Sequence, residues 1–170
     1  MGSARVFGDN INTDYIIASK YKSKVMDVTA LVPHVMEDIR PGFAATIAPG
    51  DLLVAGENFG SGSSREIAAR VLREAGLSAV LARSFARIFF RNAINVGFPV
   101  LEVDTRGIEE GDRLELDLSS GVLRNMTRHW DRAVATLPPV MLEILRDGGL
   151  AAHLRKHRGF AFAARGVNRG

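Results

Sequence analysis

The sequence predicts an α/β domain in which a mostly parallel sheet is flanked by helices and carries a small antiparallel β section. Between residues 51 and 101, short apolar runs alternate with amphipathic helical segments, the pattern of parallel strands joined by crossover helices. After residue 104 the pattern changes, and residues 113–118 alternate strictly between polar and apolar side chains. Strict alternation is typical of a half-exposed strand and favours antiparallel pairing.

The N-terminal elements follow from local composition. Residues 4–7 are expected to form the first strand, and the polar, turn-rich stretch 8–14 forms the loop after it. Residues 19–27 show no clear period and are interpreted as a loop that carries three lysines. Asp27 can cap the helix that follows. The apolar positions of that helix are Leu31, Val35 and Met36.

A strand–loop–helix unit occupies the centre of the chain. The strand is expected at 51–55 and the helix at about 63–75, with a glycine-rich loop between them. A buried strand at 77–82 comes next. It leads into a helix that Ser84 can cap and that Gly97 ends.

The remaining elements complete the α/β part and add the antiparallel section. A further strand begins at Pro99. The antiparallel section turns at Gly121, and its third strand is expected at 132–136. The pair 138–139, both prolines, opens a last helix that the glycines at 148–149 break.

Composition indicates an ordinary globular protein. The chain has 170 residues, of which 46% are hydrophobic and 24% charged, so one domain with a sizeable core is expected. No apolar run approaches the roughly 20 residues of a membrane helix, and the N-terminus does not resemble a signal peptide. A cytoplasmic protein without membrane contact is therefore expected. The absence of cysteine excludes disulfides, a thiol nucleophile and cysteine-ligated metal within this chain.

The net charge is +3, and much of the excess lies near the C-terminus. Residues 158–170 are interpreted as a solvated basic tail. A basic tail can also attract nucleic acid. The chain lacks the interleaved aromatic residues of a stacking platform, so no nucleic-acid partner is expected.

The most informative stretch is residues 56–66, which read Gly-Glu-Asn-Phe-Gly-Ser-Gly-Ser-Ser-Arg-Glu. Its glycines let the backbone approach a ligand closely, and it ends where a helix begins. Free N–H groups at a helix N-terminus favour an anion. The hydroxyls of Ser63 and Ser64 and the guanidinium of Arg65 therefore predict a site for a small carboxylate or phosphate. The alternatives are that the serines cap the helix and that Arg65 pairs with Glu66 or another acid.

This stretch does not match the common phosphate or nucleophile motifs. It lacks the Lys-Ser/Thr pair of a Walker A loop, and Arg65 stands where a Rossmann fingerprint needs its third glycine. It also lacks the Gly-x-Ser-x-Gly elbow. Nucleotide binding and ordinary esterase chemistry are disfavoured.

Several other polar residues remain open to two interpretations. Asp14 either orients an arginine or a substrate hydroxyl, or only stabilises its turn. The loop lysines recognise an anion or form a solvated surface, and three arginines spaced by four residues form an exposed stripe or a partner-binding face. These residues are Lys20, Lys22, Lys24, Arg83, Arg87 and Arg91. The histidines lack metal-ligand spacing, so no metal site is expected. We expect His34, His129, His153 and His157 at the surface.

Four stretches in this order resemble a known family: residues 9–17, 56–66, 84–95 and 145–150. The chain is similar, over about residues 4–157, to the small subunits of the isopropylmalate isomerase family, which includes homoaconitase and methylmalate-type dehydratases. These subunits correspond to the mobile swivel domain of aconitase. The resemblance implies a swivelling β/β/α domain over 1–157, followed by the tail.

The resemblance also implies an activity. It is that of a hydro-lyase that isomerises a 2-hydroxy di- or tricarboxylate, such as 3-isopropylmalate, by removing and returning water. Such an enzyme works only with a separate, cysteine-bearing large subunit that holds a 4Fe–4S cluster, and no cofactor is expected on this chain. A non-catalytic regulatory module that binds a small anion is the alternative.

The resemblance assigns roles to matching residues. Ser63 matches the serine base, Ser64 and Arg65 match groups that hold a substrate carboxylate, and Asp14 matches an active-site aspartate. Lys24 lies in the loop that selects the substrate, where relatives carry arginine, which suggests a different and smaller alkylmalate. The chain also departs from the family pattern at two positions: Ile67 replaces a common histidine, and Ser61 replaces a common cysteine.

Overall fold

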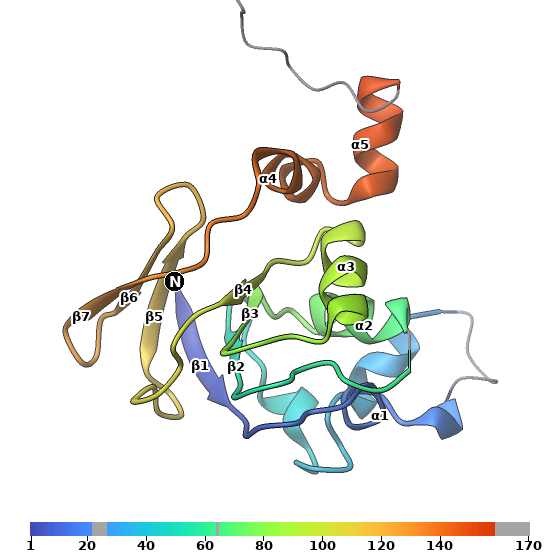
Figure 1. Ribbon diagram of the computed structural model, residues 1–170. Coiled ribbons are helices and arrows are strands. Elements are labelled where there is room, and N and C mark those ends of the chain that lie inside the picture. The colour runs from blue at the N-terminus through green and yellow to red at the C-terminus, as the bar shows by residue number, and fades with distance from the viewer. Residues whose placement is uncertain (22–26, 64, 159–170) are drawn as a thin grey trace, which may run out of the picture.

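A computed structural model describes residues 1–21, 27–63 and 65–158 of the chain. The described part contains one mixed sheet of seven strands in the order β4-β3-β2-β1-β5-β6-β7 (Figure 1). The predicted fold class is therefore confirmed. The strands are β1 (Gly2–Val6), β2 (Leu52–Val54), β3 (Ala79–Ala82), β4 (Val100–Glu102), β5 (Arg113–Asp117), β6 (Val122–Asn125) and β7 (Trp130–Ala133).

β1 joins the two halves of the sheet. On one side it pairs in parallel with β2, and β3 and β4 continue that parallel half. On the other side β1 pairs antiparallel with β5. The strands β6 and β7 extend this half by further antiparallel pairing. The parallel half places the carboxyl ends of its strands at one edge, where the loops of the candidate site lie.

Helices cover one face of the parallel half (Figure 1). The two longest described helices, α2 (Glu66–Glu74) and α3 (Arg87–Asn95), are the crossover connections between β2, β3 and β4 and pack against each other. The C-terminal helices α4 (Pro139–Arg146) and α5 (Leu150–His157) pack on α3. Short helical turns complete the fold: α1 (Thr13–Ile16), η1 (Ser19–Tyr21), η2 (Thr29–His34) and η3 (Phe43–Thr46).

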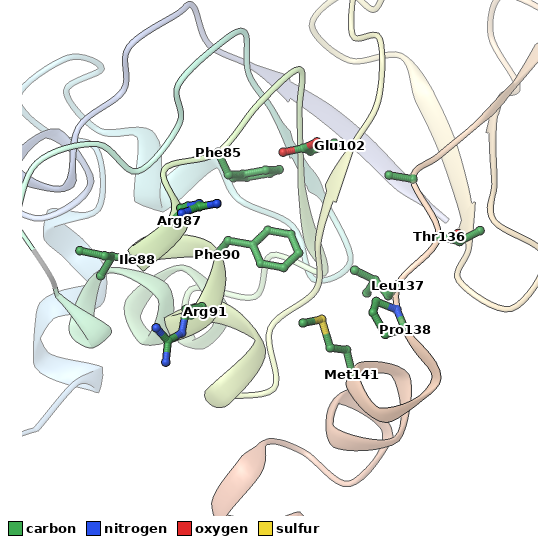
Figure 2. A pocket seen from close by; sticks show the side chains of 11 residues that line it. Phe85, Arg87, Ile88, Phe90, Arg91, Glu102, Thr136, Leu137, Pro138 and Met141 are labelled. Atoms are coloured by element: carbon green, nitrogen blue, oxygen red, sulfur yellow. The ribbon is translucent and has the colours of Figure 1, made fainter.

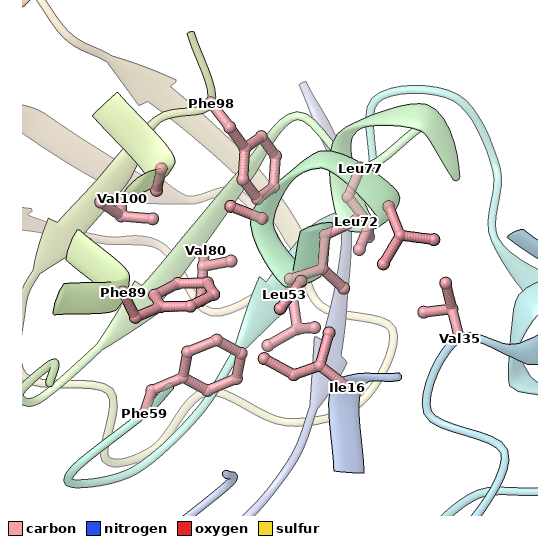
Figure 3. Close-up of a cluster of buried hydrophobic side chains, with 14 of the residues drawn as sticks. Ile16, Val35, Leu53, Phe59, Leu72, Leu77, Val80, Phe89, Phe98 and Val100 are labelled. Atoms are coloured by element: carbon pink, nitrogen blue, oxygen red, sulfur yellow. The ribbon is translucent and has the colours of Figure 1, made fainter. Parts of the chain in front are cut away.

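The sheet separates two hydrophobic clusters because successive side chains of a strand point to opposite faces. In β2, Leu53 lies in the cluster beneath the helices, whereas Leu52 lies in the cluster on the other face. The helix-side cluster is rich in aromatic rings, including Phe59, Phe89 and Phe98 (Figure 3). The ring of Phe59 meets that of Phe89 edge-on at 5.2 Å, which anchors the start of the glycine-rich loop to α3.

Three expected elements differ from the structure in kind or position. The helix expected after Asp27 is the 3₁₀ helix η2, because Pro33 lies inside it and interrupts α-helical hydrogen bonding. The helix expected from residue 63 begins at Glu66. The third antiparallel strand is β7, earlier than the expected 132–136, because Asn125 pairs with Trp130 across a tight turn.

Two expected surface or capping roles are wrong. Ser84 does not cap α3; its hydroxyl accepts the N–H of Asn58 instead, and Ala86 occupies the N-cap. His153 is buried, with 1% of its surface exposed, because its ring packs beside α4 and bonds Asp147. No helix in the described ranges has both the length and the apolar character needed to cross a bilayer. The division at residue 158 stays a prediction.

Candidate active site

The candidate site is built from two loops that follow neighbouring parallel strands. The loop after β1 and the glycine-rich loop after β2 leave the sheet at the same edge, and backbone hydrogen bonds join them. The N–H of Asn10 bonds the carbonyl of Glu57 at 2.8 Å, and the N–H of Gly60 bonds that of Ile11 at 2.7 Å. Two polypeptide segments about 50 residues apart in sequence thereby form one ledge.

Two glycines permit this close approach. A Cβ on Gly56 would lie 1.7 Å from Oδ1 of Asp9, in the loop after β1. A Cβ on Gly60 would lie 2.2 Å from the Phe89 ring, and Gly60 also has a φ of +79°. A larger residue at position 60 would force the glycine-rich loop away from Phe89, whereas at position 56 it would displace the Asp9 carboxylate.

Thr13 fixes the part of the ledge that carries Ser63. Its N–H donates to the carbonyl of Ser61 at 2.8 Å, and its hydroxyl donates to the carbonyl of Ser63 at 3.1 Å. Thr13 is itself buried. These bonds hold residues 61–63 in a non-helical bend, in which Gly62 has a φ of +97°, and α2 therefore starts later than expected.

Ser63 itself is exposed on this ledge. Its hydroxyl has no hydrogen-bond partner among the residues that the structure describes, so it caps none of their N–H groups. The N-cap of α2 is Arg65, which makes no side-chain capping bond. Ser64 lies outside the described residues.

Arg65 is a buried cation held by the loop after β1. Its Nη1 lies 2.6 Å from Oδ1 of Asp14, and its Nη2 donates to the Ser19 hydroxyl at 3.0 Å. A longer bond of 3.4 Å reaches the carbonyl of Ile17. Only 7% of the side chain is exposed. Of the interpretations left open, pairing with another acid is confirmed; Glu66 instead lies near Arg70.

One donor of Arg65 is unused. Its Nε is buried and has no hydrogen-bond partner within the described part of the chain. Buried polar atoms are nearly always satisfied, so this N–H needs an acceptor that the described residues do not supply. A carboxylate oxygen is the acceptor that a guanidinium prefers.

Asp14 is positioned by its own short helix. Asn12 caps α1 by accepting the N–H groups of Asp14 and Tyr15, and the Ser19 hydroxyl donates to Oδ1 of Asp14 at 2.5 Å. Ser19 therefore bridges Asp14 and Arg65. The interpretation that Asp14 orients an arginine is confirmed.

Sequence reasoning missed Asn12, Thr13 and Ser19 as parts of the site. The role of Asn12 could have been predicted from the sequence, because asparagine is a favoured N-cap. The roles of Thr13 and Ser19 could not, since their partners are distant in sequence. Lys24 and Lys22 lie outside the described residues. Lys20 forms ion pairs at the surface with Glu37 and Asp38, which favours the solvated interpretation for this lysine.

Comparison with known proteins identifies the family. The model of the aconitase C-terminal domain matches residues 9–106, which include both loops of the ledge. The chain belongs to the aconitase C-terminal domain family. It is 51% identical to 3-isopropylmalate dehydratase small subunit 2 of Archaeoglobus fulgidus, over 92% of this chain and 95% of that protein. It is 47% identical to the methanogen homoaconitase small subunit of Methanothermobacter thermautotrophicus, over 88% and 87%.

A solved structure agrees with this placement. The crystal structure of 3-isopropylmalate dehydratase from Methanocaldococcus jannaschii superimposes with a TM-score of 0.89 at 41% identity, covering 92% of this chain and 93% of that one. The resemblance inferred from the four sequence stretches is confirmed. The relatives are named as small subunits, and this chain contains no cysteine.

Proposed function

We propose that this chain is the small subunit of a hydro-lyase that isomerises a 2-hydroxy di- or tricarboxylate, such as 3-isopropylmalate, together with a large subunit. The observation that carries the proposal is the ledge itself. It presents an exposed serine hydroxyl and a buried guanidinium with an unused N–H, in a chain whose relatives are small subunits of such enzymes.

Arg65 would hold one carboxylate of the substrate. Asp14 and Ser19 fix its two terminal nitrogens, so little conformational entropy remains to be lost when the substrate binds. The unused Nε–H offers a charge-assisted hydrogen bond to a carboxylate oxygen. Ser64, the neighbouring residue in sequence, would provide a second contact to the same carboxylate.

Ser63 would act as the base. As the alkoxide, its oxygen would accept the proton from the carbon next to the one that loses hydroxide. The electron pair of that C–H bond would form the second bond of the alkene as the C–O bond to the departing hydroxide breaks. When water returns, the proton and the hydroxide add to the two carbons in the opposite arrangement, which gives the isomer. A serine hydroxyl is a weak base in water, so this role needs an enclosed site. The large subunit would supply that enclosure, since Ser63 is exposed in the single chain.

The iron–sulfur cluster implied by the family fits this chain only as a group held elsewhere. The chain has no cysteine, so thiolate ligands for a 4Fe–4S cluster would come from the large subunit. When bound there, such a cluster supplies a Lewis acid that eases the departure of hydroxide. The residues of this chain do the rest: they orient the carboxylate and move the carbon-bound proton.

Reconstitution tests the proposal. This chain and its large subunit are purified separately and assayed alone and mixed, on a panel of alkylmalates that includes 3-isopropylmalate. We expect the alkene to form only in the mixture. Its formation is monitored by its absorbance in the ultraviolet. A mixture that forms a complex but converts no member of the panel would favour the alternative, a non-catalytic module that binds a small anion.

A further inference from the structure

A groove lies outside the ledge, between α3 and the segment that leads into α4. Its volume is about 610 Å³. Figure 2 shows Phe85 and Phe90 on one side and Leu137, Pro138 and Met141 on the other. The groove is thus apolar at its walls, although it opens at the surface of the molecule.

The outward face of α3 adjoins this groove and is unusual for an exposed surface. Ile88 is 50% exposed, and a second hollow of about 270 Å³ lies beside it, lined also by Asn92 and Asn95. Arg87 and Arg91 flank Ile88 on the same helix, and both are exposed. Neither arginine has an ion-pair partner among the described residues. We call Arg87, Ile88, Arg91 and the 610 Å³ groove the α3 face.

The α3 face is connected directly to the candidate site. The carbonyl of Ser84 accepts the N–H of Phe59 at 3.0 Å, and the N–H of Ala86 returns to the carbonyl of Phe59 at 2.9 Å. The segment that enters α3 is therefore hydrogen-bonded to the glycine-rich loop, four residues before Ser63. A partner that covers Ser63 from the side of this segment would therefore also contact the start of α3.

The chemistry of the α3 face selects the kind of partner. Exposed apolar side chains beside a groove gain affinity when a partner desolvates them, and arginine is the cation most often found in such contacts. Unpaired arginines call for carboxylates. A second copy of this chain bound through the same patch would set Arg87 and Arg91 against a face with two arginines and one lining carboxylate, Glu102, because twofold contacts are self-complementary. The charge pattern therefore disfavours a homodimer.

We propose that the α3 face is a docking surface for the large subunit, occupied by a segment of that subunit that inserts an apolar side chain beside Ile88 and presents carboxylates to Arg87 and Arg91. This inference rests on the proposed function, because it takes its partner from there. It adds where the partner binds and by what chemistry it is recognised.

Charge and polarity reversals test the docking surface. We expect Ile88→Asp and Arg91→Glu each to raise the Kd for the large subunit about tenfold or more, measured by sedimentation or interferometry at physiological salt. Arg155→Glu, the same charge change on exposed α5, is the matched control and should leave the Kd within about twofold. Circular dichroism verifies that each variant is folded, as expected for exposed positions.

Thiol labelling gives a second readout that does not depend on a weakened complex. Because the chain has no cysteine, Ile88→Cys introduces its only thiol, and mass spectrometry of this chain follows the label. We expect Ile88→Cys to be labelled at least tenfold more slowly in the complex than in the free chain. The control Arg155→Cys should be labelled equally fast in both.

The outcomes separate this inference from the proposed function. An unchanged Kd for both α3 variants, or labelling of Ile88→Cys at one rate in free chain and complex, would overturn the docking surface. Failure of the wild-type chain to bind the large subunit would overturn it too. A complex that forms through the α3 face but converts no substrate would overturn the proposed function and leave the docking surface standing.

Discussion

At the scale of single residues, the ledge gives different surroundings to two residues, Ser63 and Arg65, for which different roles are proposed. Ser63 is exposed, whereas Arg65 is buried and held by Asp14 and Ser19. A group that must take a proton from a substrate has to be reachable, and a group that must hold a carboxylate in one orientation benefits from being fixed. Thr13 holds the Ser63 carbonyl and thereby fixes the residue that is proposed as the base.

Ser63→Ala tests the first role. We expect kcat of the reconstituted complex to fall by about 10²–10⁴, the contribution typical of a general base, because no hydroxyl remains to accept the carbon-bound proton. Assembly with the large subunit should be unchanged. Ser61→Ala, in the same loop, is the control and should keep most of the activity. A Ser63→Ala complex with wild-type kcat would refute the base assignment.

Asp14→Asn tests the second role. The substitution leaves the buried Arg65 guanidinium without its anionic partner, so we expect the free energy of unfolding to fall by about 1–2 kcal/mol. The loss is smaller than for a fully buried pair because half of the Asp14 side chain is exposed. We also expect kcat/KM to fall, because Arg65 is less firmly oriented. Urea titration and steady-state kinetics measure the two effects; full stability would argue against the pair.

At the scale of elements, the loops after β1 and β2 depend on their contact with α3. Gly60 lets the glycine-rich loop lie against Phe89, and the Phe59 ring packs on the same side chain. The site is therefore placed by a helix that contributes no residue to it. The opposite face of the same helix is the proposed docking surface, so the proposal places the partner on the helix that supports the ledge.

Gly60→Ala tests this dependence. The added Cβ would lie 2.2 Å from the Phe89 ring at a backbone φ of +79°, so overpacking adds to backbone strain. We expect a loss of about 2–4 kcal/mol in the free energy of unfolding. Gly111→Ala is the matched control, since its φ is +83° but nothing lies within 4 Å of the added atom. It should lose only about 1 kcal/mol; equal losses would contradict the packing argument.

At the scale of the whole molecule, carboxylates tie distant segments together. Burial acts to raise the pKa of Asp51, but the N–H of Ala48 and the guanidinium of Arg5 outweigh it and leave the pKa lowered. Asp51 thereby links β1, the junction of the two sheet halves, to the turn before β2. Near the C-terminus, hydrogen bonds from Lys156 and His153 hold the pKa of Asp147 well below its usual range and join α4 to α5.

These lowered pKa values predict acid-labile stability. A carboxyl group whose pKa is lower in the folded than in the unfolded chain stabilises the fold above its unfolded pKa, about 4, and that contribution is lost as pH falls toward the folded value. We expect the urea midpoint to fall steeply below about pH 4. Asp51→Asn should be less stable at pH 7 and less dependent on pH than the wild type. An identical slope in the variant would rule out Asp51 as a source.

Much of the fold could be predicted from the sequence, because strands and helices leave local, periodic signals. The strand at 51–55 and the strictly alternating strand after Gly111 are close to β2 and β5. The family resemblance rested on residue strings and was equally local. Errors arose where a contact between distant segments decided the outcome. Thr13 bonds the Ser63 carbonyl, so α2 starts later than predicted, and the Ser84 hydroxyl accepts the N–H of Asn58 instead of capping α3.

The sequence by itself determined the fold class and the family, and it predicted which polar side chains of the glycine-rich loop form the candidate site. Only the tertiary structure decided that Arg65 pairs with Asp14 rather than Glu66 and that His153 is buried. It also decided that Arg65 Nε has no partner among the residues described. The physical reason is range. Propensity and periodicity act over a few residues, whereas pairing and burial depend on which loops the parallel sheet brings to the same edge.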